Sequence, residues 1–195
     1  MVNKIILASA SKSRADLLQG AGLDIECCPA DLDENLIKSE GLSVRQTALK
    51  LSFAKAMAVS EKYPGSYIIG ADQMMECEGQ RYDKPVDQKE AKKQLMDLRG
   101  KIHHLISAVS IVKNGELIWS YAQDAELEMR DFSDMFLDCY LEDIGDDVLT
   151  TVGGYRLESK GVQLFSRIEG DYFTILGLPL LALLEFLRSR DILTR

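Results

Sequence analysis

The sequence has no apolar run that approaches the ~20 residues a helix needs to span a bilayer. Its N-terminus enters a short apolar stretch at once, without the longer apolar region and the small-residue cleavage site of a signal peptide. Both absences argue against a membrane partner, and we expect a cytoplasmic protein.

Side chains that bind zinc are scarce. None of the four cysteines belongs to a CxxC pair and only two histidines are present, which argues against a zinc site. We expect the cysteines to be buried, reduced thiols. The histidines, His103 and His104, are adjacent, so in a strand they would point to opposite faces and have structural roles.

Positive charge is in deficit as well. There are 23 lysines and arginines against 31 aspartates and glutamates, a net charge of −8. Binding to nucleic acid needs a basic face, so we expect no nucleic-acid partner, although a local basic pocket stays possible. The composition, 46% hydrophobic and 28% charged, is typical of a globular protein. The length of 195 residues predicts one domain, or one domain and a small second lobe.

Short apolar runs alternate with amphipathic segments and turn signals. We expect strands at Lys4–Ala8, Asp24–Cys28, Tyr67–Met75, His103–Val112 and Leu117–Met129. Helices are expected from Ser11 or Ser13 to Gln19, from Ser43 to about Tyr63, from Asp87 to Leu98, from Ser133 through Leu141, and over Leu180–Arg188. The acidic stretch 29–41 and the glycine-rich stretch 150–178 are expected to be loops. This mixture predicts an α/β or α+β fold around a mixed sheet.

Hydroxyls and cations gather at the first expected strand-to-helix turn, in the stretch LASASKSR. The hydroxyls of Ser9 and Ser11 and the amides at a helix start can donate to phosphate oxygens. Arg14 offers a bidentate fork and Lys12 a point charge. The glycines and the GK[ST] order of a Walker A loop are absent. The alternative is an ordinary serine cap followed by solvated cations, and the turn alone favours neither.

Asp72 lies in the sequence GADQ, at the expected end of an apolar strand. A carboxylate is costly to bury there without a partner, and the small residues before it leave room for a ligand. Asp72 could hold Mg²⁺ or take a proton from water, and a reference pKa near ~3.9 would keep it ionised. The alternative, slightly favoured by the tetrapeptide alone, is an aspartate that caps a turn.

Four further charged residues are candidates with simpler alternatives. Lys55 lies among alanines of the long helix, and Lys84 precedes a proline that could aim it; either could instead be a surface lysine. Glu34, in the acidic stretch, could be a second metal ligand or simply be solvated. Glu158, between glycines, could accept hydrogen bonds from a base edge or be an exposed loop residue.

The ordered set of these motifs resembles the Maf family of nucleoside triphosphate pyrophosphatases. The family opening, L-A-S-x-S-P-R-R-x-x-L-L, is matched except that Lys12 replaces proline and Ser13 stands where arginine is common. The other matches, in chain order, are Glu34, Lys55-Ala56, Ala71-Asp72-Gln73, Lys84-Pro85, Gly100 with His103, Gly154-Tyr155, Gly161, and Gly177 to Leu180. The resemblance extends from Leu7 to about Leu187.

The resemblance implies a single domain over residues 1–195, with two lobes around a nucleotide-binding cleft. Its α/β fold would be an elongated mixed sheet flanked by helices, similar to inosine triphosphatase, and a homodimer is implied. The reaction would convert a nucleoside triphosphate and water to the monophosphate and pyrophosphate. Asp72 would be the proton acceptor or a metal ligand, with Glu34 helping to hold Mg²⁺ or Mn²⁺ and Lys84 neutralising charge. The triphosphate would be bound by Ser9, Ser11, Lys12, Arg14 and Lys55.

The resemblance also places base discrimination at Ser13, Gln73 and Glu158. Gln73 and Glu158 match the subgroup that prefers 7-methyl-GTP, whereas Ser13 lacks the aromatic ring that this subgroup carries. A carboxylate at position 158 would suit the adjacent N–H donors of guanine and repel the carbonyls of a pyrimidine. We therefore expect a guanine-like or modified purine nucleotide. Two alternatives are a regulator of septum formation with little turnover and a non-enzymatic nucleotide sensor.

Overall fold

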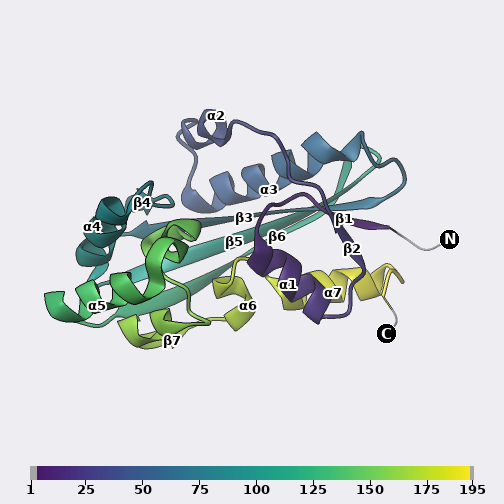
Figure 1. Ribbon diagram of the computed structural model, residues 1–195. Coiled ribbons are helices and arrows are strands. Elements are labelled where there is room, and N and C mark those ends of the chain that lie inside the picture. The colour runs from purple at the N-terminus through teal and green to yellow at the C-terminus, as the bar shows by residue number, and fades with distance from the viewer. Residues whose placement is uncertain (1–3, 194–195) are drawn as a thin grey trace. The chain divides into compact units, whose positions relative to one another are not determined.

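The structure is a computed structural model that describes residues 4–193 (Figure 1). Its strands form one seven-stranded sheet in the order β2-β1-β3-β5-β6-β7, with β4 paired to β3. The sheet is mixed, because β1 runs parallel to β2 and β3 whereas β4 and β7 run antiparallel to β3 and β6. The strands are β1 (Ile5–Leu7), β2 (Ile25–Cys27), β3 (Tyr67–Cys77), β4 (Gln80–Tyr82), β5 (Ile102–Lys113), β6 (Glu116–Met129) and β7 (Phe165–Glu169).

Helices flank this sheet, which confirms the predicted α/β class. The α-helices are α1 (Lys12–Gly20), α2 (Glu34–Lys38), α3 (Val44–Ser60), α4 (Gln88–Leu98), α5 (Asp134–Ile144), α6 (Tyr172–Ile175) and α7 (Leu180–Ser189). Three short 3₁₀ segments lie at Gly145–Thr150, Val152–Gly154 and Lys160–Leu164. Across the described residues, no helix is both long enough and apolar enough to cross a membrane.

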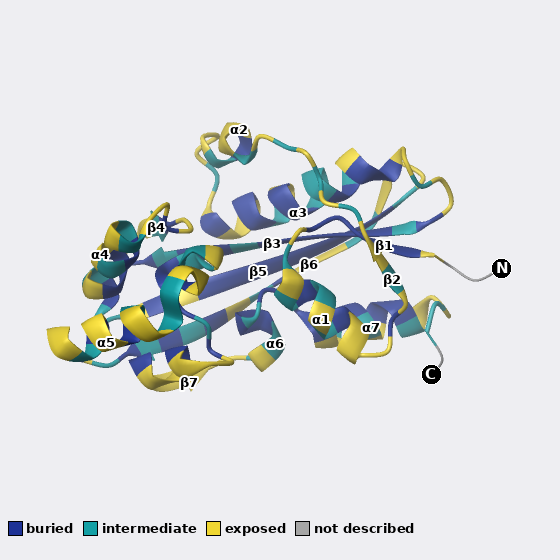
Figure 2. Ribbon diagram, in the orientation of Figure 1, coloured by how far each residue is buried: buried dark blue, intermediate teal, exposed yellow. Residues whose placement is uncertain are grey.

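The chain divides into two compact units. The first unit comprises the residues up to Gln73, Ile106–Gln123 and the residues from Asp171 onward, and the second comprises Met74–Leu105 and Asp124–Gly170. In Figure 2 the central strands are coloured mostly as buried, whereas β7 is largely exposed. The single domain with two lobes around a cleft stays a prediction.

Side chains alternate along β1 and divide the core of the first unit into two layers. Ile5 and Leu7 pack in one cluster with residues of α1 and α7, whereas Ile6 and Ala8 pack in another with residues of α3. Figure 1 shows α3 on one side of these strands and α1 and α7 on the other. Successive residues of a strand point to opposite faces, so two adjacent apolar pairs are enough to build both layers.

Helix starts are the best-predicted local features. Ser11, not Ser13, is the N-cap of α1, and its side chain accepts a hydrogen bond from the Arg14 amide. Ser43, where the long helix was predicted to start, is the N-cap of α3 and forms a capping box with Gln46. Asp87 caps α4 as predicted. These side chains satisfy amides that the helix itself leaves unpaired.

Three predictions about the chain are wrong. Residues 29–41 are not all loop, because Asp33 caps the short helix α2. Residues 150–178 contain β7 and α6 as well as irregular segments. The cysteines are free, but Cys27 and Cys139 are exposed and only Cys77 is buried.

His103 is fully buried and His104 is exposed, as the strand pattern predicted.

Candidate functional site

The predicted site begins in the middle of β3, within the first unit. Ile69 and Ala71 pack on the α1 and α7 side, and Ile68 packs on the α3 side. Alternation therefore turns Asp72 toward α3 and Gln73 the other way. The expectation that GADQ ends the strand is wrong, because β3 continues to Cys77. Asp72 does not cap a turn; its carboxylate takes part in the buried ion pair described next.

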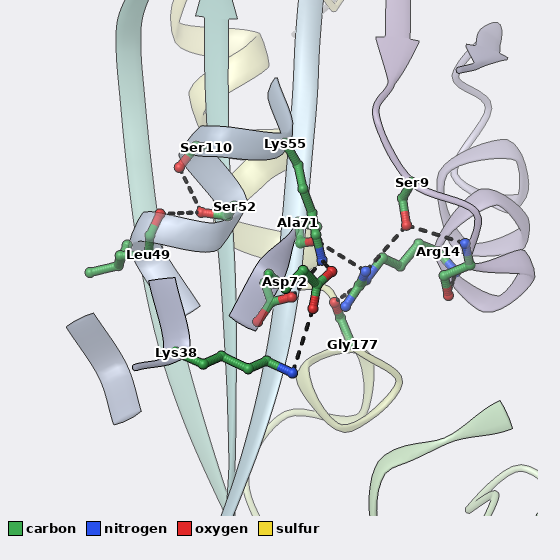
Figure 3. A network of polar contacts seen from close by, with 12 residues as sticks. Ser9, Arg14, Lys38, Leu49, Ser52, Lys55, Ala71, Asp72, Ser110 and Gly177 are labelled. Carbon is green, nitrogen blue, oxygen red and sulfur yellow. Dashed lines mark hydrogen bonds and ion pairs between the residues drawn. The ribbon is translucent and has the colours of Figure 1, made fainter. Parts of the chain in front are cut away.

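Lys55 of α3 joins two carboxylates. Its Nζ lies 2.6 Å from Asp72 Oδ1 and 2.7 Å from Glu34 Oε1. Figure 3 shows Lys55 extending from α3 to Asp72 on β3. Asp72 is only 5% exposed, and its second oxygen, Oδ2, is buried without a hydrogen-bond partner among the described residues. The alternatives of a surface lysine at position 55 and a fully solvated Glu34 are therefore wrong.

Burial sets the protonation behaviour of these groups. Desolvation raises the pKa of Asp72 above its ordinary value, although Lys55 and Arg14 oppose the shift. For Glu34, desolvation acts in the same direction, but its contacts with Lys55 and Lys38 outweigh it and the pKa is lowered. The two carboxylates therefore differ: burial makes Asp72 a stronger base than an ordinary aspartate, whereas its lysine contacts make Glu34 a weaker base than an ordinary glutamate.

Gly70 allows the helix and the strand to approach this closely. A Cβ atom at Gly70 would lie 2.0 Å from the Ser52 carbonyl oxygen and 2.7 Å from the Ala56 amide, both in the backbone of α3. On the same helix, the Ser52 hydroxyl is 2.7 Å from the Ser110 hydroxyl of β5. A glycine two residues before Asp72 thus places Lys55 within reach of the carboxylate.

Arg14 is buried instead of extending into solvent. Its Nε donates to the Gly177 carbonyl at 2.8 Å, and its Nη1 donates to the Ala71 carbonyl at 3.0 Å and to Ser9 Oγ at 3.2 Å (Figure 3). Only Nη2 makes no hydrogen bond within the part of the chain that the structure describes. Desolvation lowers the pKa of Arg14, with Asp72 and Glu34 opposing. Arg14 therefore ties three segments together, and at most one nitrogen of the predicted phosphate fork is available.

The turn before α1 retains several donors. Ser9 Oγ accepts hydrogen bonds from the Ser11 amide and from Arg14, so its own hydroxyl hydrogen is available. The amides of Lys12 and Ser13, at the start of α1, have no hydrogen-bond partner within residues 4–193. The side chain of Lys12 is exposed and that of Ser13 is half-buried. The turn is both a serine cap and a set of donors, so the two alternatives for it are compatible.

Gln73 is held by protein acceptors. Its Nε2 donates to the Ile175 carbonyl at 2.9 Å, the Ser107 hydroxyl at 3.1 Å and the Thr174 carbonyl at 3.2 Å. The Ser107 hydroxyl itself donates to the Thr174 carbonyl. The donors of Gln73 are therefore occupied, and only its Oε1 is left to accept a hydrogen bond from a ligand.

Two predicted site residues belong to the second unit. Glu158 accepts a hydrogen bond from Arg156 Nε at 3.0 Å, and Lys84 is exposed in the loop after β4. The role predicted for each stays a prediction.

Two contributors to the site are not among the residues predicted from the sequence. Lys38 Nζ lies 3.6 Å from Glu34 Oε2, four residues along α2, a spacing that brings side chains together only in a helix. Because this segment was expected to be a loop, the pair went unnoticed. Gly177, whose carbonyl accepts a hydrogen bond from Arg14, belongs to the motif Gly177 to Leu180. It has no side chain that would indicate a role in the site.

The family follows from a comparison over almost the whole chain. A family model described as Maf-like protein matches residues 4–190. The chain belongs to the Maf family. A nucleoside triphosphate pyrophosphatase of Granulibacter bethesdensis is 48% identical to this Maf protein over 195 residues, which are 98% of this chain and 99% of that protein.

Other relatives have related names. A 7-methyl-GTP pyrophosphatase of Mesorhizobium japonicum is 42% identical over 193 residues, 97% of each chain. The class of enzyme predicted from the sequence is the class for which these Maf relatives are named. Among solved structures, the Staphylococcus aureus Ham1 protein aligns at 15% identity over 66% of this chain and 73% of that chain, with a TM-score of 0.47. That likeness is too distant to carry a functional argument.

A divalent cation would find few protein ligands in this Maf protein. Within residues 4–193, no three His, Cys, Asp or Glu side chains are arranged to hold a metal ion. Asp72 and Glu34 nevertheless converge on the Lys55 ammonium, and Asp72 Oδ2 has no hydrogen-bond partner in the described part of the chain. Mg²⁺ is commonly bound through one or two carboxylates together with substrate phosphates. The donor set therefore fits a cation that arrives with phosphate ligands.

Proposed function

We propose that this Maf protein hydrolyses a nucleoside triphosphate to the nucleoside monophosphate and pyrophosphate, with the cluster around Asp72 as its catalytic centre. The observation that carries the proposal is the buried Asp72, whose Oδ1 is held by Lys55 while its Oδ2 has no hydrogen-bond partner among residues 4–193. The names of the relatives over nearly the full chain support the same reaction.

Asp72 is suited to accept a proton from the attacking water. In the nucleotide-free protein Lys55 fixes the carboxylate through Oδ1, and Oδ2 is left to accept a hydrogen bond from water. The raised pKa makes Asp72 a better base than an exposed carboxylate. As the proton moves to Oδ2, the water oxygen bonds to the α-phosphorus. The bond from this phosphorus to the oxygen that bridges the α- and β-phosphates breaks, and pyrophosphate leaves with that oxygen.

The turn before α1 would hold the triphosphate. The Ser9 hydroxyl and the amides of Lys12 and Ser13 are donors without other acceptors in the described chain, and a helix start favours an anion. Lys12 would add positive charge at the surface of this turn. The role proposed for Lys84 is to neutralise charge on the leaving pyrophosphate. Positioning and charge neutralisation would then supply most of the rate enhancement.

Asp72 and Glu34 would hold the divalent cation, Mg²⁺ or Mn²⁺. When bound, the cation would neutralise charge on the phosphates and the leaving pyrophosphate. Chelation of divalent ions should therefore abolish pyrophosphate release, and either ion added back should restore it.

The test of the reaction is pyrophosphate release from a panel of nucleoside triphosphates, including methylated GTP, with Mg²⁺ or Mn²⁺. Asp72→Asn keeps the shape of the side chain but removes the base, so kcat should fall by about 100-fold or more. Asp16→Asn, at an exposed position of α1, is the matched control and should leave kcat unchanged. Release by Asp72→Asn at the wild-type rate would refute the assigned role.

The substrate base is proposed to be guanine-like or a modified purine, with Ser13, Gln73 and Glu158 as the discriminating residues. Gln73 can only accept through Oε1, and Glu158 is an acceptor as well, which suits the N–H donors of guanine. Glu158→Gln should lower the ratio of kcat/KM for GTP over UTP by about tenfold. An unchanged ratio would exclude Glu158 from base recognition.

The remaining proposals concern the setting of the reaction. We expect a cytoplasmic homodimer that acts on free nucleotide, and sedimentation would measure its oligomeric state. The alternative of a septum-formation regulator finds no support among the relatives and is not proposed.

A further inference from the structure

Lys55 occupies the point at which the two proposed cation ligands meet. Its Nζ contacts Asp72 Oδ1 and Glu34 Oε1 at 2.6 and 2.7 Å, and its side chain is only 14% exposed. No other hydrogen bond of Nζ occurs among the described residues. The ammonium therefore has two carboxylates as its acceptors, whereas the carboxylates have few other cations: Lys38 for Glu34, and the surrounding field of Arg14 for Asp72.

A metal ion and this ammonium compete for the same oxygens. Mg²⁺ bonds to oxygen at about 2.0–2.1 Å, so a cation that bridges the facing oxygens Asp72 Oδ1 and Glu34 Oε1 would take the place that the Lys55 ammonium now has. A divalent ion beside an unmoved ammonium would also suffer strong repulsion at this partly buried place. Binding of the cation therefore requires Lys55 to move.

We propose that Lys55 is a resident counter-ion, which a divalent cation displaces only when a triphosphate is present to receive the ammonium. This inference rests on the proposed role of Asp72 and Glu34 as cation ligands. In the nucleotide-free protein Lys55 keeps the buried Asp72 paired. When the triphosphate binds, its oxygens accept the hydrogen bonds of Lys55 and also coordinate the cation. The cation therefore binds weakly in the absence of nucleotide and tightly in its presence.

The test measures Mn²⁺ binding to the full chain without nucleotide, from the electron paramagnetic resonance signal of free Mn²⁺. Lys55→Met removes the competing charge, so Mn²⁺ should bind about tenfold more tightly than to the wild type. Adding Asp72→Asn to Lys55→Met should remove this gain. A role of Lys55 in phosphate binding alone predicts no gain, because no phosphate is present.

Lys50→Met is the matched control. Lys50 lies on the same helix, and its partner is Glu40 at the surface, away from Asp72. This variant loses one lysine charge from α3 and should bind Mn²⁺ as the wild type does. Lys55→Gln is a second variant that still donates a hydrogen bond to Asp72 and so protects the fold; it should also tighten Mn²⁺ binding.

Two results would overturn the inference. One is that Lys55→Met and Lys55→Gln bind Mn²⁺ no more tightly than the wild type does. Failure of all three proteins, the wild type and both variants, to bind Mn²⁺ counts as the same result. The other is a gain that survives Asp72→Asn, since the metal would then bind elsewhere. The proposed function fails separately, through absence of pyrophosphate release from the wild type, and that assay is independent of metal binding in the absence of nucleotide.

Discussion

At the scale of single residues, the site is organised by charges taken out of water. Asp72 and Arg14 are both buried, and a buried charge is tolerated only when it is paired and hydrogen-bonded. Lys55 provides the pairing for Asp72. The carbonyls of Ala71 and Gly177 provide acceptors for Arg14. Because these contacts cross from α1 and α3 to β3, each charge also fixes the position of a neighbouring segment.

Arg14→Lys should show that the shape of the side chain matters as well as its charge. Lysine cannot reproduce the donors at Nε and Nη1, so at least one buried carbonyl or hydroxyl loses its partner. We expect the free energy of unfolding to fall by about 2–3 kcal/mol, measured by urea denaturation. Lys12→Met, two residues away and exposed, should change it by less than about 0.5 kcal/mol. Equal stability of Arg14→Lys and the wild type would contradict the structural role.

The chemical types at the site were predictable, but their partners were not. The sequence predicted that Asp72, Glu34 and Lys55 belong to one site, because their motifs occur in a recognisable order. Nothing in it placed the Lys55 ammonium between the two carboxylates, since that contact depends on how closely α3 packs on β3. Likewise the serine turn suggested a phosphate fork at Arg14, whereas long-range contacts to Gly177 and Ala71 occupy most of its donors.

At the scale of elements, the close packing of α3 on β3 depends on one missing side chain. Gly70→Ala would put its Cβ 2.0 Å from the Ser52 carbonyl, so the backbone of α3 must move away from the strand. We expect a loss of about 1–3 kcal/mol or more in thermal or urea unfolding, and slower pyrophosphate release because Lys55 moves relative to Asp72.

Gly20→Ala is the matched control for that substitution. Gly20 is the last residue of α1, and an added Cβ there has nothing within 4 Å. This variant should be as stable as the wild type or up to about 1 kcal/mol more stable, since alanine favours the helix. If both glycine variants unfold alike, the close approach of α3 is not what Gly70 provides.

Local signals predicted the elements well where they are strong. Capping residues marked the starts of α1, α3, α4 and α5, and β5 and β6 lie where strands were predicted at His103–Val112 and Leu117–Met129. The signals failed where an element is short. The helix α2 has only five residues, and β7 is mostly exposed, so neither is long or apolar enough to show the periodicity that predicts an element.

At the scale of the whole molecule, stability depends on both units, and the second unit has its own buried polar pair. His103 Nε2 and the Tyr155 hydroxyl are 2.7 Å apart, and His103 Nδ1 is buried without a partner among the described residues. Desolvation, with a smaller contribution from His104, lowers the pKa of His103 to about 4. The imidazole is therefore neutral in the folded protein at pH values where the unfolded chain binds a proton.

This difference predicts an acid-sensitive stability. Above about pH 7 the imidazole is neutral in both states; as the pH falls from about 6.5 to 4 only the unfolded chain gains the proton, so His103 lowers the free energy of unfolding by about 3 kcal/mol. His103→Gln removes that contribution, and the wild-type and variant unfolding curves, followed by circular dichroism, should differ in pH dependence across this window. His104→Gln, at the exposed neighbouring position, should keep most of the wild-type dependence, because desolvation is the larger cause of the lowered pKa of His103. Parallel pH profiles for the wild type and His103→Gln would mean that His103 is not held neutral by its burial.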